Sequence, residues 1–145
     1  MPQDESPDDP GRGSERFHHA RAAQSVAVLE DYAEMIDDLI AEMGEARITD
    51  IAARMGVTHP TATKAVGRLK REGLAVSRPY RGVFLTEEGA ALAARCRTRH
   101  RVVVDLLVAV GVPPDTAEID AEGLEHHVSE TTLRAFESYL AGRRG

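Results

Sequence analysis

Apolar residues recur at mixed three- and four-residue spacings along most of the chain, which is the pattern of helices that bury one face. The first such segment runs from about Ala22 to Met43, where Gly44 is expected to end the helix. We expect Thr49 to cap a second, short helix. Thr58 should cap a third helix, which runs to Arg71 with a proline in its first turn.

The pattern changes after the third helix. β-branched and apolar residues on both sides of a turn at 78–82 predict a two-stranded hairpin. Thr86 should then cap a long helix, and two shorter helices are expected from about Asp115 to His127 and from Ser129 to Leu140. The order helix, helix, turn, helix, hairpin is typical of a winged helix-turn-helix.

These elements predict a mainly α-helical chain with a small β-hairpin. Residues 21–86 would form an N-terminal winged helix-turn-helix domain that binds DNA, and residues 87–145 a second, helical domain. Residues 1–20 begin with an acidic segment rich in proline and glycine. Such a composition buries little apolar surface, so we expect residues 1–20 to be a disordered arm.

Composition limits the class of protein. The 145 residues suffice for one core, or for one small domain with an appendage. No apolar run approaches the roughly 18 residues that cross a membrane, and the first residues lack the apolar segment of a secretion signal. Cys96 is the only cysteine, which excludes an internal disulfide and a zinc ribbon. We therefore expect a cytoplasmic protein with no membrane partner.

The distribution of charge is more informative than its total. The net charge of −6 alone argues against a protein that coats nucleic acid. Residues 47–81, however, carry eight basic and two acidic side chains, a net +6, so the remainder carries −12. A basic module within an acidic chain is expected if one segment contacts phosphates and another binds cations.

The predicted third helix turns Ala62, Val66 and Leu69 inward, which leaves a polar and basic face opposite. Short hydroxyls and a lysine near its N-terminus suit base edges and nearby phosphates, whereas arginines suit phosphates. Each cation alone could belong to a solvated face, but the set together favours double-stranded DNA as the partner. The expected DNA-binding residues are Pro60, Thr61, Thr63, Lys64, Arg68, Arg71 and, in the hairpin, Arg81.

A second set of polar residues lies on predicted helices outside the basic module. Residues three and four apart share a helical face, so their side chains can converge. Four carboxylates and two imidazoles without a thiolate match Mn²⁺ or Fe²⁺ better than copper(I) or structural zinc. Spacing alone leaves open that these acids lie on solvated faces, and that Cys96 is a further ligand. The candidate metal ligands are Asp31, Glu34, His100, Glu122, Glu125 and His126.

Several segments resemble the diphtheria-toxin-repressor family of metalloregulators. The similarity runs from about Leu29 to Leu140 and includes DYAEMIDDLI, ARITDIAARMGVTHPTATKAVGRLKREGL, YRGVFLTEEG and, most specifically, DAEGLEHHVS. The resemblance implies that the six candidate ligands hold a binuclear manganese site. Iron-responsive members have methionine in place of Asp31 and cysteine in place of Glu122, and carboxylates at those positions favour manganese. We also expect the chain to lack the SH3-like domain of the iron-responsive members.

The residue patterns and the resemblance together predict a manganese-responsive transcriptional repressor that controls manganese homeostasis genes. We expect it to bind palindromic operator DNA as a homodimer, with the helical domain serving in dimerisation and metal binding. The expected cofactor is Mn²⁺, two ions per subunit, with Fe²⁺ or Co²⁺ as alternatives. Metal between the first and fifth helices would hold the two reading heads at the one-turn spacing that a palindrome demands. Apolar residues in excess of what a small monomer readily buries predict the dimer interface. They are Val102, Val103, Leu106, Leu107 and Val110 on the long helix and Leu133, Phe136, Tyr139 and Leu140 at the end of the chain.

Two other classes of function fit parts of the pattern. Binuclear enzymes in helical bundles also use carboxylate and histidine ligands, but a basic helix-turn-helix without an added nucleophile or base argues against an enzyme. A winged-helix regulator gated by iron would keep the DNA-binding domain, and one gated by a small organic ligand would keep it and leave the acids solvated. We expect no organic substrate. Replacing Glu122 and Glu125 by alanine separates these alternatives.

Overall fold

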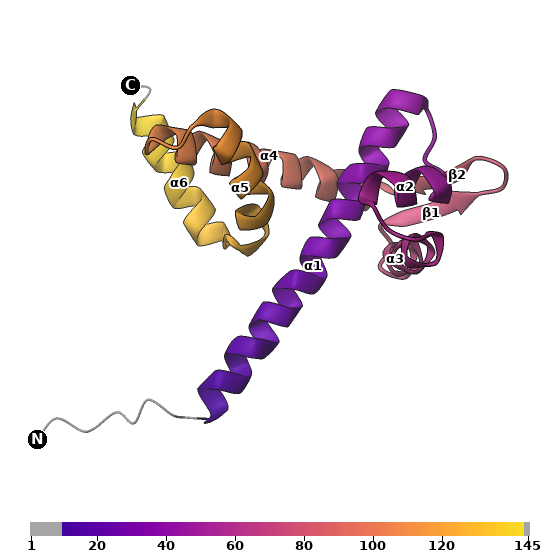
Figure 1. Ribbon diagram of the computed structural model, residues 1–145, viewed down its shortest axis with the longest axis horizontal. Coiled ribbons are helices and arrows are strands. Elements are labelled where there is room, and N and C mark those ends of the chain that lie inside the picture. Colours follow the sequence, from indigo (N-terminus) through magenta and orange to yellow (C-terminus); the bar gives the residue numbers. More distant parts are fainter. Residues whose placement is uncertain (1–9, 144–145) are drawn as a thin grey trace, which may run out of the picture.

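The computed structural model describes residues 10–143. The first elements are α1 (Pro10–Met43), α2 (Ile48–Met55), α3 (His59–Arg71), β1 (Ala75–Arg78) and β2 (Gly82–Leu85). The chain continues through α4 (Glu87–Ala109), α5 (Pro114–Leu124), the 3₁₀ turn η1 (Glu125–His127) and α6 (Glu130–Arg143). The mainly α-helical fold with one small hairpin is thus confirmed (Figure 1).

The start of α1 differs from the expectation. The helix begins at Pro10, about three turns before Ala22, so residues 10–20 are helical rather than disordered. Arginine, alanine and glutamate in this segment favour helix, and extending a helix that is already anchored costs less than nucleating one. Residues 1–9, which the expected arm also included, lie outside the described residues.

One hydrophobic core joins α1, α2, α3 and the hairpin. Ile36 of α1, Ile51 of α2 and Leu69 of α3 are fully buried in a single cluster. Val83 of β2 closes this cluster, and its backbone N–H donates to the carbonyl of Ala46 at 2.8 Å. The core therefore fixes α3 and the hairpin relative to α1.

Helix caps account for two of the boundaries. Thr58 and Thr86 each accept a hydrogen bond from the backbone N–H three residues further on, as expected of N-caps. The expectation for Thr49 is wrong, because α2 begins at Ile48 with Arg47 as its N-cap. Arg47 already has extended backbone, since the residue before it pairs with β2.

α4 leads from the hairpin into a second group of helices, in which α5 and α6 pack against it (Figure 1). Val103 of α4, Ala121 of α5 and Leu133 of α6 are buried there. α1 packs against α4 and η1 as well as against α2 and α3, so it contacts both groups. The expected fifth helix stops at Leu124, and the next three residues tighten into η1.

Apolar side chains remain at the surface of the second group. Val110, Ile119 and Tyr139 are 63%, 74% and 50% exposed. Val103 and Leu133, which were expected at a dimer interface, are instead buried within the chain. Within residues 10–143, no helix is both long and apolar enough to cross a bilayer.

Candidate metal centre and nucleic-acid interface

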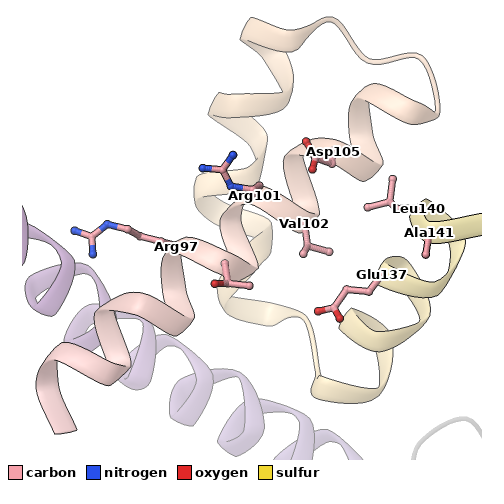
Figure 2. A pocket seen from close by; sticks show the side chains of 8 residues that line it. Arg97, Arg101, Val102, Asp105, Glu137, Leu140 and Ala141 are labelled. Atoms are coloured by element: carbon pink, nitrogen blue, oxygen red, sulfur yellow. The ribbon is translucent and has the colours of Figure 1, made fainter. Parts of the chain in front are cut away.

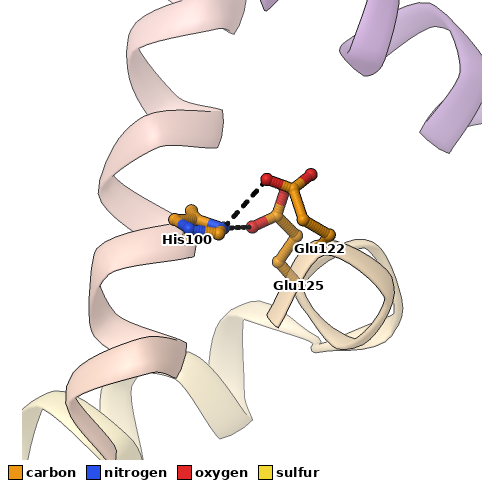
Figure 3. A group of neighbouring side chains, drawn as sticks. All are labelled: His100, Glu122 and Glu125. Atoms are coloured by element: carbon orange, nitrogen blue, oxygen red, sulfur yellow. Dashed lines mark hydrogen bonds and ion pairs between the residues drawn. The ribbon is translucent and has the colours of Figure 1, made fainter. Parts of the chain in front are cut away.

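Side chains from α4, α5 and η1 converge around His100 (Figure 3). Its Nδ1 lies 2.5 Å from Oε2 of Glu125 and 3.9 Å from Oε1 of Glu122. Each of these three residues offers one donor atom, and the three atoms lie within 4.8 Å of one another. Donors this close together can hold a divalent cation.

A second group of donors surrounds His126, where η1 meets α1. The Nε2 of His126 lies 2.9 Å from Oδ1 of Asp31 and 3.4 Å from Oε1 of Glu125. Glu125 therefore presents one oxygen to each histidine and joins the two groups. Its side chain is only 2% exposed, so this carboxylate is held by its neighbours rather than by water.

Glu34 completes the set. It lines a cavity of about 280 Å³ together with His100 and Glu122, so the structure brings all six candidate ligands into one region. Oε1 of Glu34 and Nε2 of His126 are buried and have no hydrogen-bond partner among the described residues. For His126 this means that the 2.9 Å approach to Asp31 lacks the alignment of a hydrogen bond. Buried donor atoms left in this state fit the role of metal ligands.

Two carboxylates of the cluster, Glu125 and Glu34, resist ionisation. Burial raises the pKa of Glu125 from 4.5 to about 7, although His100 opposes the shift. Burial, followed by the charge of Glu122, raises the pKa of Glu34. A cation placed among such acids would stabilise their charged forms and lower their pKa values.

The two imidazoles shift toward their protonated forms. The carboxylates of Asp31 and Glu30 raise the pKa of His126 to about 10, which outweighs the effect of burial. Burial acts to lower the pKa of His100, but Glu118 and Glu125 outweigh it and raise that pKa. The His126 ring is therefore doubly protonated at neutral pH, and a cation would have to displace one of its protons.

Glu30 was missing from the candidate ligands, yet it is a buried carboxylate behind His126, only 4% exposed. Its Oε2 accepts hydrogen bonds from the Cys96 thiol at 3.0 Å and from Nη1 of Arg99 at 3.2 Å. Burial acts to raise the pKa of Glu30, but His126, Cys96 and Arg99 together lower it. Burial raises the pKa of the Cys96 thiol, which stays protonated against Glu30 and does not join the ligand set. The sequence held one signal for Glu30, because this acid lies next to Leu29 on the apolar stripe of α1, where a charged side chain is unexpected.

Glu118 of α5 was also missing from the candidates. Its Oε2 lies 2.7 Å from Nε2 of His100, on the side of the ring away from Glu125. The Glu118 side chain is 61% exposed, so nothing in the apolar pattern marked it. The donors that face inward are thus carboxylate and imidazole only, a set that suits a hard or borderline divalent cation.

The polar side of α3 and the tip of the hairpin form the candidate nucleic-acid interface. The hydroxyl of Thr61 accepts a hydrogen bond from that of Thr58 at 2.9 Å, and the hydroxyl of Thr63 donates to the carbonyl of His59 at 3.0 Å. These hydroxyls are thus partly engaged within the helix and its cap. The exposed members of the expected set are Pro60, Thr61, Thr63, Lys64, Arg71 and Arg81.

Arg68 departs from this face. Its Nη1 donates to the carbonyl of Ser25 in α1 at 3.3 Å, and its Nε lies 3.5 Å from Oε1 of Glu72. Arg68 therefore braces α3 against α1. Tyr80, by contrast, is 97% exposed at the hairpin tip with a positive φ of 64°, an unusual backbone for a tyrosine. Sequence reasoning placed Tyr80 in a turn but not in the interface.

A groove of about 440 Å³ lies between α4 and α6 (Figure 2). Val102 and Leu140 line it beside charged residues, and none of the six candidate ligands does. Arg97 at its edge forms ion pairs with Asp37 and Asp38 of α1. These pairs tie α4 to α1 near the cluster.

Two family profiles match the chain in succession. Residues 24–83 match the N-terminal DNA binding domain of iron dependent repressors, and residues 86–143 match their metal binding and dimerisation domain. The chain belongs to the iron-dependent-repressor family. It is therefore a transcriptional regulator and not an enzyme.

Individual proteins similar to the chain are also named as transcriptional regulators. The chain is 52% identical over 122 residues to the transcriptional regulator MntR of Escherichia coli O6:H1, covering 84% of this chain and 79% of that protein. Its fold is similar to that of the manganese regulator SloR, with a TM-score of 0.68, 29% identity and 78% of this chain covered. A manganese-dependent transcriptional repressor solved with manganese gives a TM-score of 0.63, 27% identity and 77% coverage of this chain. The chain spans 53% and 51%, respectively, of those two solved chains.

Proposed function

We propose that this protein is a cytoplasmic, manganese-responsive repressor that binds operator DNA as a homodimer when its carboxylate and histidine cluster holds Mn²⁺. The observation that carries the proposal is the origin of the ligands. Two come from α1, which is built into the core of the DNA-binding unit, and the others come from α4, α5 and η1. The proposed ligands are Asp31, Glu34, His100, Glu122, Glu125 and His126.

Manganese, and two ions per subunit, are the favoured occupancy. The ligand set is carboxylate and imidazole, and similar solved structures are described as manganese regulators. Glu125 faces both histidines with different oxygens, which is the arrangement of a carboxylate that bridges two ions. Fe²⁺ or Co²⁺ would find the same ligands, so selectivity must be measured.

The coupling between the cluster and DNA runs through α1. In the metal-free chain, Glu34 on α1 faces Glu122 on α5, and like charges favour separation of the two helices. A bound cation supplies positive charge that offsets this repulsion. α1 then holds a fixed position against α5 and η1, and it carries α3 with it through the core and through Arg68.

We divide the chain into a DNA-binding domain of residues 21–86 and a dimerisation and metal-binding domain of residues 87–145. Lys64, Arg71 and Arg81 would contact phosphates of the operator. The exposed apolar residues of α4 to α6 would form the interface between subunits. Two reading heads related by a two-fold axis would bind half-sites about 34 Å apart.

The test is a fluorescence-anisotropy titration of the protein against a palindromic fragment of its own promoter at fixed salt. We expect tight binding with micromolar Mn²⁺ and weak binding with chelator. Glu122→Ala should lose the response to Mn²⁺, whereas Glu137→Ala, which removes an acid of α6 outside the proposed ligand set, should keep it. Equal binding with chelator and with Mn²⁺ would contradict the proposal and leave a regulator gated by another ligand.

Linkage gives a second test of the same proposal. If Mn²⁺ tightens DNA binding by some factor, operator DNA must tighten Mn²⁺ binding by the same factor. Such couplings are typically about 1 to 3 kcal/mol, or roughly 5- to 150-fold. Identical Mn²⁺ affinities with and without the operator would show that the cluster is not the switch.

A further inference from the structure

The two histidines of the cluster share a feature that the six proposed ligands do not explain. Each ring turns one nitrogen toward those ligands and the other toward a carboxylate that is not among them. His100 has Nδ1 at Glu125 and Nε2 at Glu118, 2.7 Å away. His126 has Nε2 at Asp31 and Nδ1 at Glu30, 3.4 Å away.

A neutral imidazole has one N–H and one lone pair, and only the lone pair can bind a cation. A carboxylate facing one nitrogen stabilises the N–H on that nitrogen and leaves the lone pair on the other. Glu118 therefore favours His100 with the proton on Nε2 and the lone pair on Nδ1. Glu30 favours the opposite tautomer of His126, with the proton on Nδ1 and the lone pair on Nε2.

We propose that Glu30 and Glu118 are positioning residues that set opposite tautomers of His126 and His100 and aim one ring nitrogen of each into the cluster. Neither is a ligand in this assignment. The inference rests on the proposed function, since it concerns how the same cluster receives its cation.

The two carboxylates differ in how firmly they are held. Glu30 is buried, and the Cys96 thiol and Arg99 guanidinium donate to the same oxygen that faces His126. Two donors besides His126 thus fix the position of this carboxylate. Glu118 lies on the surface of α5, where water competes with His100 for its oxygens. Glu30 should therefore have the larger effect on metal affinity.

The effect follows from how such partners behave elsewhere. Removing a carboxylate that orients a metal-binding histidine typically lowers metal affinity about 10- to 100-fold. We expect Glu30→Ala to lie in that range and Glu118→Ala near or below its lower end. Glu30→Gln and Glu118→Gln keep an oxygen that can accept the N–H, so they should restore most of the affinity.

The experiment uses the full chain and two readouts. Free Mn²⁺ is followed by electron paramagnetic resonance to give affinities, and ¹¹³Cd²⁺ replaces Mn²⁺ for nuclear magnetic resonance. Coupling between ¹¹³Cd and ¹⁵N identifies the ring nitrogen that binds the ion. Glu130→Ala is the matched control, because Glu130 also pairs with Arg99, at 3.7 Å, but faces neither histidine.

We expect coupling to Nδ1 of His100 and to Nε2 of His126 in the wild type and in Glu130→Ala. The coupling of the affected ring should weaken or move to the other nitrogen in each alanine variant. Coupling to Nε2 of His100 in the wild type would make Glu118 a neighbour of the ion and would overturn the assignment. Alanine variants with unchanged affinity and unchanged coupling would also overturn it.

Folding is controlled independently. Glu30→Ala leaves buried donors without a partner and can destabilise the chain, so thermal melts of each metal-free variant accompany the titrations. Glu118 is exposed, and its substitution tests the inference where folding is not at risk. A wild type that binds neither ion would refute the proposed function itself, whereas normal binding with unaffected variants would refute only the positioning roles.

Discussion

Glu125 offers a direct test of the view that the cluster is destabilising without its cation. This carboxylate is 1% exposed, and burial raises its pKa from 4.5 to about 7. A group whose folded-state pKa is raised stabilises the fold below its unfolded pKa and loses that contribution as pH rises through the folded pKa. Glu125→Gln removes the titration and keeps a side chain of nearly the same shape.

The magnitude follows from the shift. A difference of about 2.5 pH units between the two pKa values corresponds to about 3 kcal/mol when the titration is complete. Between pH 5 and pH 7.5 the wild type should lose about 2 kcal/mol of this amount, because the unfolded carboxyl is already largely ionised at pH 5. His126, whose pKa is raised from 6.5 to about 10, also loses part of its contribution over this range, because the unfolded imidazole gives up its proton above about pH 6.5. Wild type and Glu125→Gln both carry His126, so this part is common to the two proteins.

The assay is urea unfolding with chelator present at pH 5 and at pH 7.5. The stability of Glu125→Gln relative to wild type should rise by about 2 kcal/mol between the two values of pH, whatever constant offset the amide introduces. Glu137→Gln, an exposed acid on α6, should show no such trend. A relative stability that stays constant or falls with pH would refute the argument that burial dominates the ionisation of Glu125.

Three further outcomes are expected. Lys64→Ala should reduce the slope of log K against log salt for operator binding by about 0.9 if it removes one phosphate contact, whereas Arg68→Ala should leave the slope unchanged and lower the melting temperature, because Arg68 braces α3 against Ser25. Gly82→Ala should destabilise the hairpin in thermal melts and weaken DNA binding, since φ is +90° there and a Cβ would lie 2.5 Å from the Ala46 carbonyl oxygen. A chain that begins at Arg21 should melt within about 2 °C of the full chain, because the side chains described between Gly13 and His18 are exposed; a larger loss would show that the N-terminal part of α1 packs against the rest.

Much of the fold could be predicted because its signals are local. Threonine caps at Thr58 and Thr86 and an inward stripe on α3 depend on residues within a turn or two. The predicted helix boundaries were wrong where contacts between residues distant in the sequence determine them. α2 begins two residues earlier than expected because the preceding chain pairs with β2. The break between α5 and η1 comes just after Gly123, but this glycine lies within α5 and did not indicate a helix end by itself.

The site shows the same division. Helical spacing indicated that Glu122, Glu125 and His126 would share one face, and the structure brings them into one region but not onto one point. η1 turns His126 toward α1, so this ring faces Asp31 while Glu122 stays near His100. No local sequence pattern encodes that separation, because it depends on how α1 packs against η1.

That separation explains why the cluster can act as a switch rather than as a static support. If all the ligands lay on α5 and η1, a cation would bind within one unit and leave the DNA-binding unit unaffected. Asp31 and Glu34 instead belong to a helix whose opposite side, through Ile36 and Leu39, forms the core that carries α3. The same helix therefore sets both the position of these two ligands and the position of α3. A cation that discriminates between two positions of α1 must discriminate equally between two positions of α3.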